Sequence, residues 1–526
     1  MAIIGPIQYG GLNTKTASIS SPPAVGVWAD IPTGQMSTCQ DFNKNYSSLL
    51  ARPATAQFST TLNGANQVVN GLAWYSDANN YSQGIQIYAM CNGGLFQNAM
   101  VTNASTPLTF TARTGAISMQ GTLGNPYTFD ILNNILVGCG GSGSGKTPFK
   151  ITAYNVNAVA LTGAPLGDCV KVVNNFLFIG RQLNAASTYS RVSWSNVGDP
   201  TTWTAANYVD FRVNDGDRVQ ALGSIGQDLY IFKRNSIGRL STTTQIISGA
   251  VTLGPLQTIS IGTGTLGPWA LDNMPDGRIV FLASDGRLKL FDGTSFTDLS
   301  DMPYPGPNIQ ASFDEIAGGP NFSAICVRVF PDHHQIIVCF TGYSTGYRCY
   351  VYDWFEEFWS QWTGITPTIL LNVPRLENSN VDNGAFGMAS VFYEGNSIGT
   401  VVQLNKTISL YGPGNDAGTN INPSCTVNIM LGGDLSNFTP RSIIIPFTNS
   451  NSSAAQCLIT TGWDGTLSGG TTYTLGASPA FSNIIVPIPF ASSGTTVRPR
   501  TLQMKITGTN WGPILHPFYL SDEVLA

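Results

Sequence analysis

Charged residues are scarce in this sequence. Only 10% of the 526 residues are Asp, Glu, Lys or Arg, against roughly 25% in an average soluble protein. This scarcity excludes long surface helices rich in Glu and Lys from most of the chain. The 25 Lys and Arg against 30 Asp and Glu give a net charge of −5, with no run of basic residues. Broad electrostatic binding to nucleic-acid phosphates is therefore not expected.

Long apolar runs and spaced cysteine pairs are missing as well. No segment approaches the roughly 18 apolar residues of a membrane helix, so no membrane segment is expected, and the start of the chain lacks the regions of a secretory signal. The nine cysteines are an odd set without C-x-x-C spacing. This argues against a disulfide framework and a zinc site. We expect reduced, buried cysteines, and we predict neither a metal nor a cofactor.

What recurs along the chain is a short apolar run bounded by turns rich in Asn, Asp, Gly or Ser, which is a β-sheet pattern. Successive runs begin about 50 residues apart, a period typical of propeller blades with three or four strands each. The clearest runs are residues 85–91, 135–137, 176–179, 229–232, 279–282, 336–340 and 388–393.

Two of these repeats can be divided into strands directly. In the fifth, the strands 278–282 and 287–291 flank Asp285-Gly286, a pair that favours tight hairpin turns. The sixth contains four apolar runs, the number of strands in one blade. These runs are residues 324–330, 335–340, 347–352 and 358–362.

The expected fold is all-β, a β-propeller of about six to seven blades with an N-terminal arm and a C-terminal β-sandwich-like domain. Residues 1–65 are rich in Pro, Ser and Thr, and we expect an arm or platform segment with little core of its own. Residues 66–410 form the predicted propeller. Residues 411–526 form the predicted sandwich, either alone or joined with the N-terminal segment in a platform. Within it, Thr501–Thr507 alternates like a half-buried antiparallel strand.

The strongest chemical motif is the sequence G-G-S-G-S-G-K-T, a full match to a phosphate-binding loop. In such a loop Gly140, Gly145, Lys146 and Thr147 would surround the phosphates, and the Lys-Thr pair would begin a helix. Here a proline and an alternating strand pattern follow instead. We therefore interpret the motif as a Gly/Ser-rich hairpin loop and predict no nucleotide site.

Candidates for acid–base or metal chemistry are few. Of the three histidines, His333 and His334 are neighbours that would point to opposite sides of an extended chain, and His516 is remote in sequence. Glu356 and Glu357 are likewise adjacent, which disfavours the carboxylate spacing of about 5 to 9.5 Å in glycosidases, although another blade could supply the second acid. No catalytic residue is assigned, and we predict that the chain is not an enzyme.

An aromatic segment at residues 353–362 contains Trp354, Trp359 and Trp362. It could be a sugar-stacking platform, but packing between blades is favoured, because a closed ring of sheets must fill wedge-shaped gaps with large side chains. The D-G-D sequence that begins at Asp215 lacks the third oxygen ligand and the distal Glu of a calcium loop. It is interpreted as a turn.

Several segments resemble the tail nozzle or hub proteins of short-tailed bacteriophages, a family of β-propeller proteins that close the lower end of the tail. The most distinctive match is W-S-N-V-G-D-P-T-T-W at residues 194–203, a strand followed by a Gly-Asp-Pro turn. The other matching segments are residues 39–42, 50–54, 217–222, 228–233, 335–338, 350–353 and 392–396.

This resemblance implies a structural component of the virion tail, assembled in the host cytoplasm as a homo-hexameric ring. The ring would bind a tail adaptor ring protein, and tail fibres, spikes or a needle are further expected partners. It would close the tail channel and let double-stranded DNA pass without specific binding during ejection. The alternative function is a carbohydrate-binding or glycan-cleaving propeller, which would use the three tryptophans of residues 353–362 together with Glu356 and Glu357.

Overall fold

The computed structural model describes most of the chain, and every structural statement below refers to the described residues. These are residues 3–10, 12, 36–45, 48–52, 55–62, 68–99, 107–115, 117, 126–140, 147–181, 188–243, 245–247, 250–302, 308–317, 325–343, 346–373, 391–396, 400–404, 415–416, 419–430, 440–449, 455–463, 466–475, 478–488, 501–509 and 513–522. Their regular structure is almost entirely β-strand. In this part of the chain, no helix has the length and apolar character needed to span a membrane.

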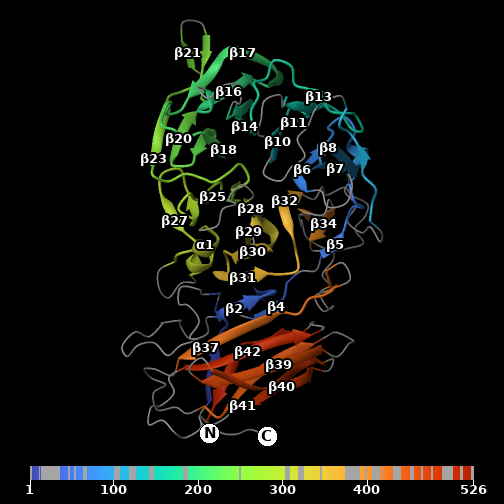
Figure 1. Ribbon diagram of the computed structural model, residues 1–526, viewed down its shortest axis with the longest axis vertical. Helices are drawn as coiled ribbons and strands as arrows, with labels where there is room; N and C mark the ends of the chain where they lie inside the picture. Colours follow the sequence, from blue (N-terminus) through green and yellow to red (C-terminus); the bar gives the residue numbers. More distant parts are fainter. Residues whose placement is uncertain are drawn as a thin grey trace.

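Seven sets of four antiparallel strands radiate from a common axis as the blades of a β-propeller (Figure 1). Blades 1 to 4 are β6 (Val69–Ser76), β7 (Ile85–Cys91), β8 (Gly94–Ala99), β9 (Thr111–Ala112); β10 (Tyr127–Leu132), β11 (Ile135–Gly140), β12 (Phe149–Ile151), β13 (Val159–Ala160); β14 (Cys169–Val173), β15 (Phe176–Gly180), β16 (Arg191–Asn196), β17 (Asp199–Asp210); and β18 (Val219–Ile225), β19 (Asp228–Lys233), β20 (Ser236–Ser241), β23 (Leu256–Ile261). The hairpin β21 (Gln245–Ile247) and β22 (Ala250–Thr252) lies between β20 and β23 in the chain.

Blades 5 to 7 complete the circle. They are β24 (Leu271–Asn273), β25 (Ile279–Leu282), β26 (Leu288–Phe291), β27 (Phe296–Asp298); β28 (Ile325–Phe330), β29 (Gln335–Tyr343), β30 (Gly346–Asp353), β31 (Phe358–Trp362); and β32 (Pro367–Val373), β33 (Val391–Asn396), β34 (Val401–Leu404), β5 (Thr55–Gln57). The helix α1 (Gln310–Ala317) connects blades 5 and 6. The innermost strands contact one another in the order β6, β10, β14, β18, β24, β28, β32 and again β6. The predicted all-β propeller is therefore confirmed, with seven blades.

The ring is closed by a strand from outside the expected propeller range. β5 pairs antiparallel with β34, where Gln57 lies opposite Val402. The described part of residues 1–65 therefore supplies the outer strand of blade 7. Three residues are too few to give a strand pattern, and the partner strand lies more than 300 residues away, so local periodicity could not reveal this pairing.

The hairpins of the blades use the turn residues that the sequence indicated. Gly286, in the predicted Asp-Gly turn of blade 5, has φ of 79°. In blade 2, Asn133 and Asn134 both have positive φ, as do the two asparagines between β14 and β15. Turns with two positive φ angles match the twist of the strands they join, and Asn tolerates this conformation better than most residues. The predicted strands of blades 5 and 6 are confirmed.

A β-sandwich formed from both ends of the chain lies below the propeller in Figure 1. We call it the terminal sandwich. Its strands are β1 (Ile3–Ile7), β2 (Met36–Gln40), β3 (Phe42–Asn45), β4 (Ser48–Ala51), β37 (Ser424–Met430), β38 (Ser442–Asn449), β39 (Ala455–Trp463), β40 (Thr466–Leu475), β41 (Ser478–Pro487), β42 (Thr501–Thr509), β43 (Ile514–Leu515) and β44 (Phe518–Ser521). The predicted apolar face of β42 is confirmed, since Leu502, Met504 and Ile506 are fully buried and Lys505 on the other face is exposed, although Gln503 on that other face is buried as well.

The N-terminal strands are integral to this sandwich. β1 pairs with β44, β2 with β37 and β4 with β43. Tyr9, Met36, Phe42 and Leu49 are fully buried in the same core as the C-terminal strands. The described N-terminal residues therefore share their core with the C-terminal strands, which is the predicted alternative in which both segments join in a platform. The few apolar residues of this segment pack against strands more than 350 residues away, which its Pro, Ser and Thr content conceals.

One sheet runs through both parts of the molecule. Its nine strands follow the order β28, β29, β30, β31, β2, β37, β42, β39 and β40. The junction is a parallel pairing of β31 with β2, where Gln361 lies opposite Gln40. Blade 6 and the terminal sandwich thus share backbone hydrogen bonding as well as side-chain packing.

Candidate functional site

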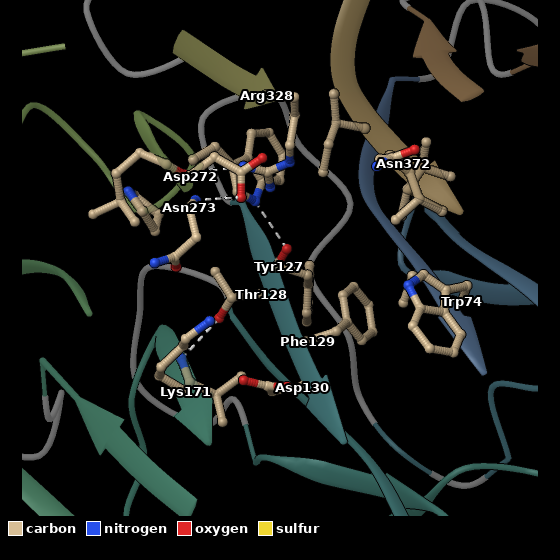
Figure 2. A pocket seen from close by; sticks show the side chains of 18 of the residues that line it. Trp74, Tyr127, Thr128, Phe129, Asp130, Lys171, Asp272, Asn273, Arg328 and Asn372 are labelled. Carbon is tan, nitrogen blue, oxygen red and sulfur yellow. Dashed lines mark hydrogen bonds between the residues drawn. The ribbon is translucent and has the colours of Figure 1, made fainter. Parts of the chain in front are cut away.

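A cavity of about 390 Å³ lies on the propeller axis, and residues from the inner strands of all seven blades line it. Figure 2 shows Arg328, Asp272 and Asn273 gathered on one side of it, with Asn372 and Trp74 on the other. The polar groups come from β10, β14, β24, β28 and β32, so the ring itself positions them.

The two carboxylates of this cavity hold neighbouring blades together. Asp130 accepts hydrogen bonds from the amide of the next residue at 2.8 Å and from the amide of Val172 in blade 3 at 2.7 Å. Asp272 likewise accepts from the next amide at 2.9 Å and from the amide of Val329 in blade 6 at 2.9 Å. Backbone amides therefore occupy the oxygens of both carboxylates. This arrangement clamps neighbouring blades together.

Arg328 joins three blades from the wall of the cavity. Its Nε donates to the carbonyl of Leu370 in blade 7 at 3.1 Å, and its Nη1 donates to the carbonyl of Leu271 in blade 5 at 3.2 Å. Lys171 contributes a second cation from blade 3. The cavity has room for a small polar solute. The hydrogen bonds of Asp130, Asp272 and Arg328, however, connect the blades to one another.

Trp269 crosses the propeller axis. Its indole N–H donates to the carbonyl of Tyr127 in blade 2 at 3.0 Å, and its own carbonyl accepts from the amide of Val327 in blade 6 at 2.8 Å. The side chain is only 5% exposed. Trp269 thus ties blades 2 and 6 to the segment preceding β24. An axis obstructed in this way, with so small a cavity, cannot conduct a DNA duplex.

Replacing Trp269 with Phe is expected to lower the free energy of unfolding by about 1–3 kcal/mol, because the buried hydrogen bond from the indole N–H to the carbonyl of Tyr127 is lost. Urea denaturation followed by fluorescence measures the change. Trp74→Phe, on the opposite wall of the same cavity, is the matched control and should cost less than about 1 kcal/mol. Equal losses in the two variants would contradict a structural role for the bond across the axis.

The phosphate-loop match lies between two antiparallel strands. Gly140 is the last residue of β11, and Thr147 is exposed just before β12. Gly145 and Lys146 lie outside the described residues. Because β11 and β12 pair antiparallel and β12 stands where a nucleotide site needs a helix, the flanks have the form of a hairpin.

The three histidines do not form one cluster: His333 and His334 are neighbours in blade 6, and His516 lies in the terminal sandwich. His333 ends the short helix η3 (Pro331–His333) and packs against Phe330, with ring centroids 4.4 Å apart. Burial lowers its pKa. His334 has φ of 54°, and its ring packs edge-to-face with that of Trp354, with the ring centroids 5.7 Å apart. His516 belongs to the terminal sandwich, where its Nδ1 lies 3.0 Å from a serine hydroxyl.

The aromatic segment of blade 6 is largely core. Trp359 and Trp362 are 0% and 2% exposed, so they offer no flat surface to a sugar. Glu356 forms an ion pair with Lys44 of the terminal sandwich at 3.3 Å. Glu357 lies in the exposed turn before β31 with φ of 48°. Trp359, Trp362 and Glu356 therefore connect blade 6 to neighbouring parts of the fold.

The D-G-D turn surrounds an ammonium group that the sequence did not single out. Lys233 is fully buried, and its Nζ lies 2.8 Å from Asp215 Oδ1, 2.8 Å from the carbonyl of Arg212 and 2.9 Å from the hydroxyl of Ser190. The carbonyl of Asp217 lies at 3.3 Å. The lysine therefore occupies the centre of the loop, where a bound cation would otherwise sit. Only its position at the end of an apolar strand could have indicated this role.

A second buried ion pair lies in blade 3, where Asp168 directly precedes β14 and Arg181 directly follows β15. Arg181 Nη1 and Asp168 Oδ2 are 2.6 Å apart, and the residues are 7% and 2% exposed. Burial raises the pKa of Asp168 to about 7, against the opposing charges of Arg181 and Arg218. No sequence motif marked this pair, because its members come from the ends of two different strands.

Two segments that resemble the phage family have structural roles. Asp41 pairs with Arg52 at 2.7 Å, and both side chains are nearly inaccessible. The same carboxylate accepts the backbone amide and hydroxyl of Thr363, just beyond β31. In the Gly-Asp-Pro turn, Asp199 accepts the hydroxyls of Thr201 and Thr202, each at 2.6 Å, and these bonds lower its pKa. Both segments stabilise the fold.

Comparison with known proteins adds little about function. No family model matches this chain, and no curated protein is significantly similar to it. Similar solved structures include the WD40 domain of coronin from Toxoplasma gondii, with 11% identity and a TM-score of 0.36 over 74% of this chain and 94% of that one. Another is a puromycin-hydrolyzing peptidase of Mycobacterium tuberculosis, with 11% identity and a TM-score of 0.37 over 74% and 60%. A third is the extracellular domain of a one-component system of B. thetaiotaomicron, with 11% identity and a TM-score of 0.39 over 92% and 64%. Such values carry no functional argument, and the chain is identified as a β-propeller by its own closed ring of seven blades.

Proposed function

We propose that this chain is a structural subunit of the tail of a short-tailed bacteriophage. Its copies assemble as a homo-hexameric ring that binds a tail adaptor ring protein, closes the tail channel and lets DNA leave during ejection. The observation that carries the proposal is the sheet that runs from blade 6 into the terminal sandwich. A ring subunit must keep its two parts at a fixed angle, and a shared sheet does this.

The junction between the two parts is reinforced where the sequence resembles the phage family. The buried pair of Asp41 and Arg52 lies beside the β2–β31 pairing, and Arg52 Nη2 also donates to the carbonyl of Thr363 at 2.7 Å. A buried, paired charge with several hydrogen bonds is costly to break. This supports a rigid subunit in which the propeller and the terminal sandwich move together.

The path of DNA in this proposal lies between copies and not through the propeller. Trp269 crosses the propeller axis, and the cavity beside it holds about 390 Å³. A channel wide enough for a duplex must therefore be enclosed by the ring of subunits. The net charge of −5 per chain favours passage without adhesion, because few cations are present to displace the counterions of the phosphates.

Electron microscopy of the full chain, alone and mixed with its adaptor ring protein, tests the proposal. We expect sixfold rings with a central opening, with the propeller and terminal sandwich of each copy in the relative position seen in Figure 1. Analytical ultracentrifugation of the same samples should show the corresponding rise in mass. A chain that stays monomeric in both samples contradicts the proposal.

The glycan alternative can be separated in the same study. A glycan-binding propeller would bind oligosaccharides on an array whether or not it forms rings. Two of the three tryptophans of that alternative, Trp359 and Trp362, are buried, whereas Trp354 is half-buried, which weakens but does not remove an aromatic platform. Saturable glycan binding by a monomer would nevertheless replace the nozzle proposal. Rings without glycan binding support it.

A further inference from the structure

Three cysteines lie in a row across blade 6. Cys326 of β28 is opposite Cys339 of β29, which in turn is opposite Cys349 of β30. All three are at most 1% exposed and belong to one hydrophobic core. Directly opposed residues of antiparallel strands have Cα atoms about 4.5–5.5 Å apart. That distance lies within the range of about 4.4–6.8 Å that a disulfide spans.

The two sulfurs of β29 and β30 are already in contact. Cys339 Sγ and Cys349 Sγ are 3.4 Å apart, whereas a disulfide bond measures about 2.0 Å. Rotation of the side chains can close this gap without moving the strands. Three thiols in a line do not converge on one point, and in the described part of the chain no group of three or more His, Cys, Asp or Glu is placed to hold a metal.

We propose that Cys339 and Cys349 form a disulfide when the protein meets a hydroperoxide. With hydrogen peroxide, one thiol sulfur attacks a peroxide oxygen and the O–O bond breaks; the sulfur keeps that oxygen as a sulfenic acid, and the other oxygen leaves as water. The second thiol then attacks that sulfur and displaces a second water. Two thiols and one hydrogen peroxide thus give one disulfide and two waters.

The position of the pair explains how a buried thiol can be reached. The β29–β30 pairing has an irregular register between Phe340 and Tyr343, directly beside Cys339, and its last pair is Tyr343 with Gly346. An interrupted ladder near a hairpin end opens more readily than the middle of a sheet. Opening this end exposes the two sulfurs while the rest of blade 6 stays folded.

The bond would act on the blade that joins the propeller to the terminal sandwich. It would tie β29 to β30 within the nine-stranded sheet. The inference is independent of the nozzle proposal, because it depends only on the register and on the distance between the sulfurs.

Peptide mapping of the native full chain tests the proposal. The protein is incubated with hydrogen peroxide, its remaining thiols are blocked with N-ethylmaleimide, and it is digested with trypsin without reduction. Each cysteine of the row falls in a different tryptic peptide, namely 290–328, 329–348 and 349–375. We expect the second and third peptides to be joined, with a mass two hydrogens below their sum, and their free forms to be depleted.

Three variants make the result specific. In Cys326→Ala the same pair of peptides should be linked, and in Cys349→Ala that link should be lost. Cys91→Ala, at a buried cysteine of blade 1, controls for the loss of a thiol elsewhere. A link between peptides 290–328 and 329–348 in the unaltered chain, or three unlinked peptides after oxidation, overturns the proposal. The unaltered chain gives this answer even if a variant fails to fold.

Discussion

Replacing Lys233 with Met is expected to lower the free energy of unfolding by about 3–5 kcal/mol, the usual cost of breaking a buried ion pair by removing one partner. The ammonium is fully buried and lies within 2.9 Å of Asp215, Ser190 and the carbonyl of Arg212. Met fills nearly the same volume, so the loss comes from polar groups and not from a cavity. The carboxylate and the carbonyls of the loop are left facing an apolar side chain, which is costly when water cannot replace the donor.

Urea denaturation of the full chain measures this effect, with Lys505→Met as the matched control. Lys505 is exposed on β42, and the same substitution there should change the free energy of unfolding by less than about 0.5 kcal/mol. Adding Asp215→Asn to Lys233→Met should recover part of the loss, because the unpaired carboxylate is removed. Similar losses at positions 233 and 505 would show that the loop does not depend on its lysine.

The strands of the blades could be predicted from the sequence because their information is local. Alternating and continuous apolar runs, with Asp-Gly at the turn of blade 5, place β25 and β26 within one residue of their expected positions. The closure of the ring and the terminal sandwich could not be predicted in this way. Gln57 pairs with Val402, and Ile3 with Ser521, and a single sequence carries no signal for partners so far apart.

The residues of the candidate site likewise divide into those with a local sequence signal and those that depend on distant partners. The D-G-D turn was visible because Gly and Asp mark turns chemically, but Lys233 reaches it from another strand. Trp269 precedes β24 outside any periodic run, so nothing local distinguishes it from other tryptophans. The packing interpretation of the aromatic segment agrees with the burial of Trp359 and Trp362, because a ring of blades imposes a general need for large side chains between sheets.

The buried pair of Asp168 and Arg181 should make stability depend on pH. Burial raises the pKa of Asp168 from 3.8 to about 7, so between these values the folded protein binds the proton more tightly than the unfolded chain. Stability from this group is therefore fully present below the unfolded value and is lost as the pH rises through about 7. The loss is on the order of 4 kcal/mol, since the pKa differs by about 3 units and each unit corresponds to about 1.4 kcal/mol.

A pH series of urea denaturation on the unaltered chain and on Asp168→Asn isolates this contribution. The unaltered chain should lose stability relative to the variant between about pH 4 and 7. Asp276 provides a control of opposite sign. Its hydrogen bond from Arg278 lowers its pKa, so Asp276→Asn should remove a contribution that is fully present above the unfolded pKa and is lost as the pH falls below that value. That contribution should stay below about 1 kcal/mol, because the pair is exposed. A flat difference for Asp168→Asn would mean that Arg181 keeps the carboxylate ionised throughout, and burial would then not control the charge of this pair.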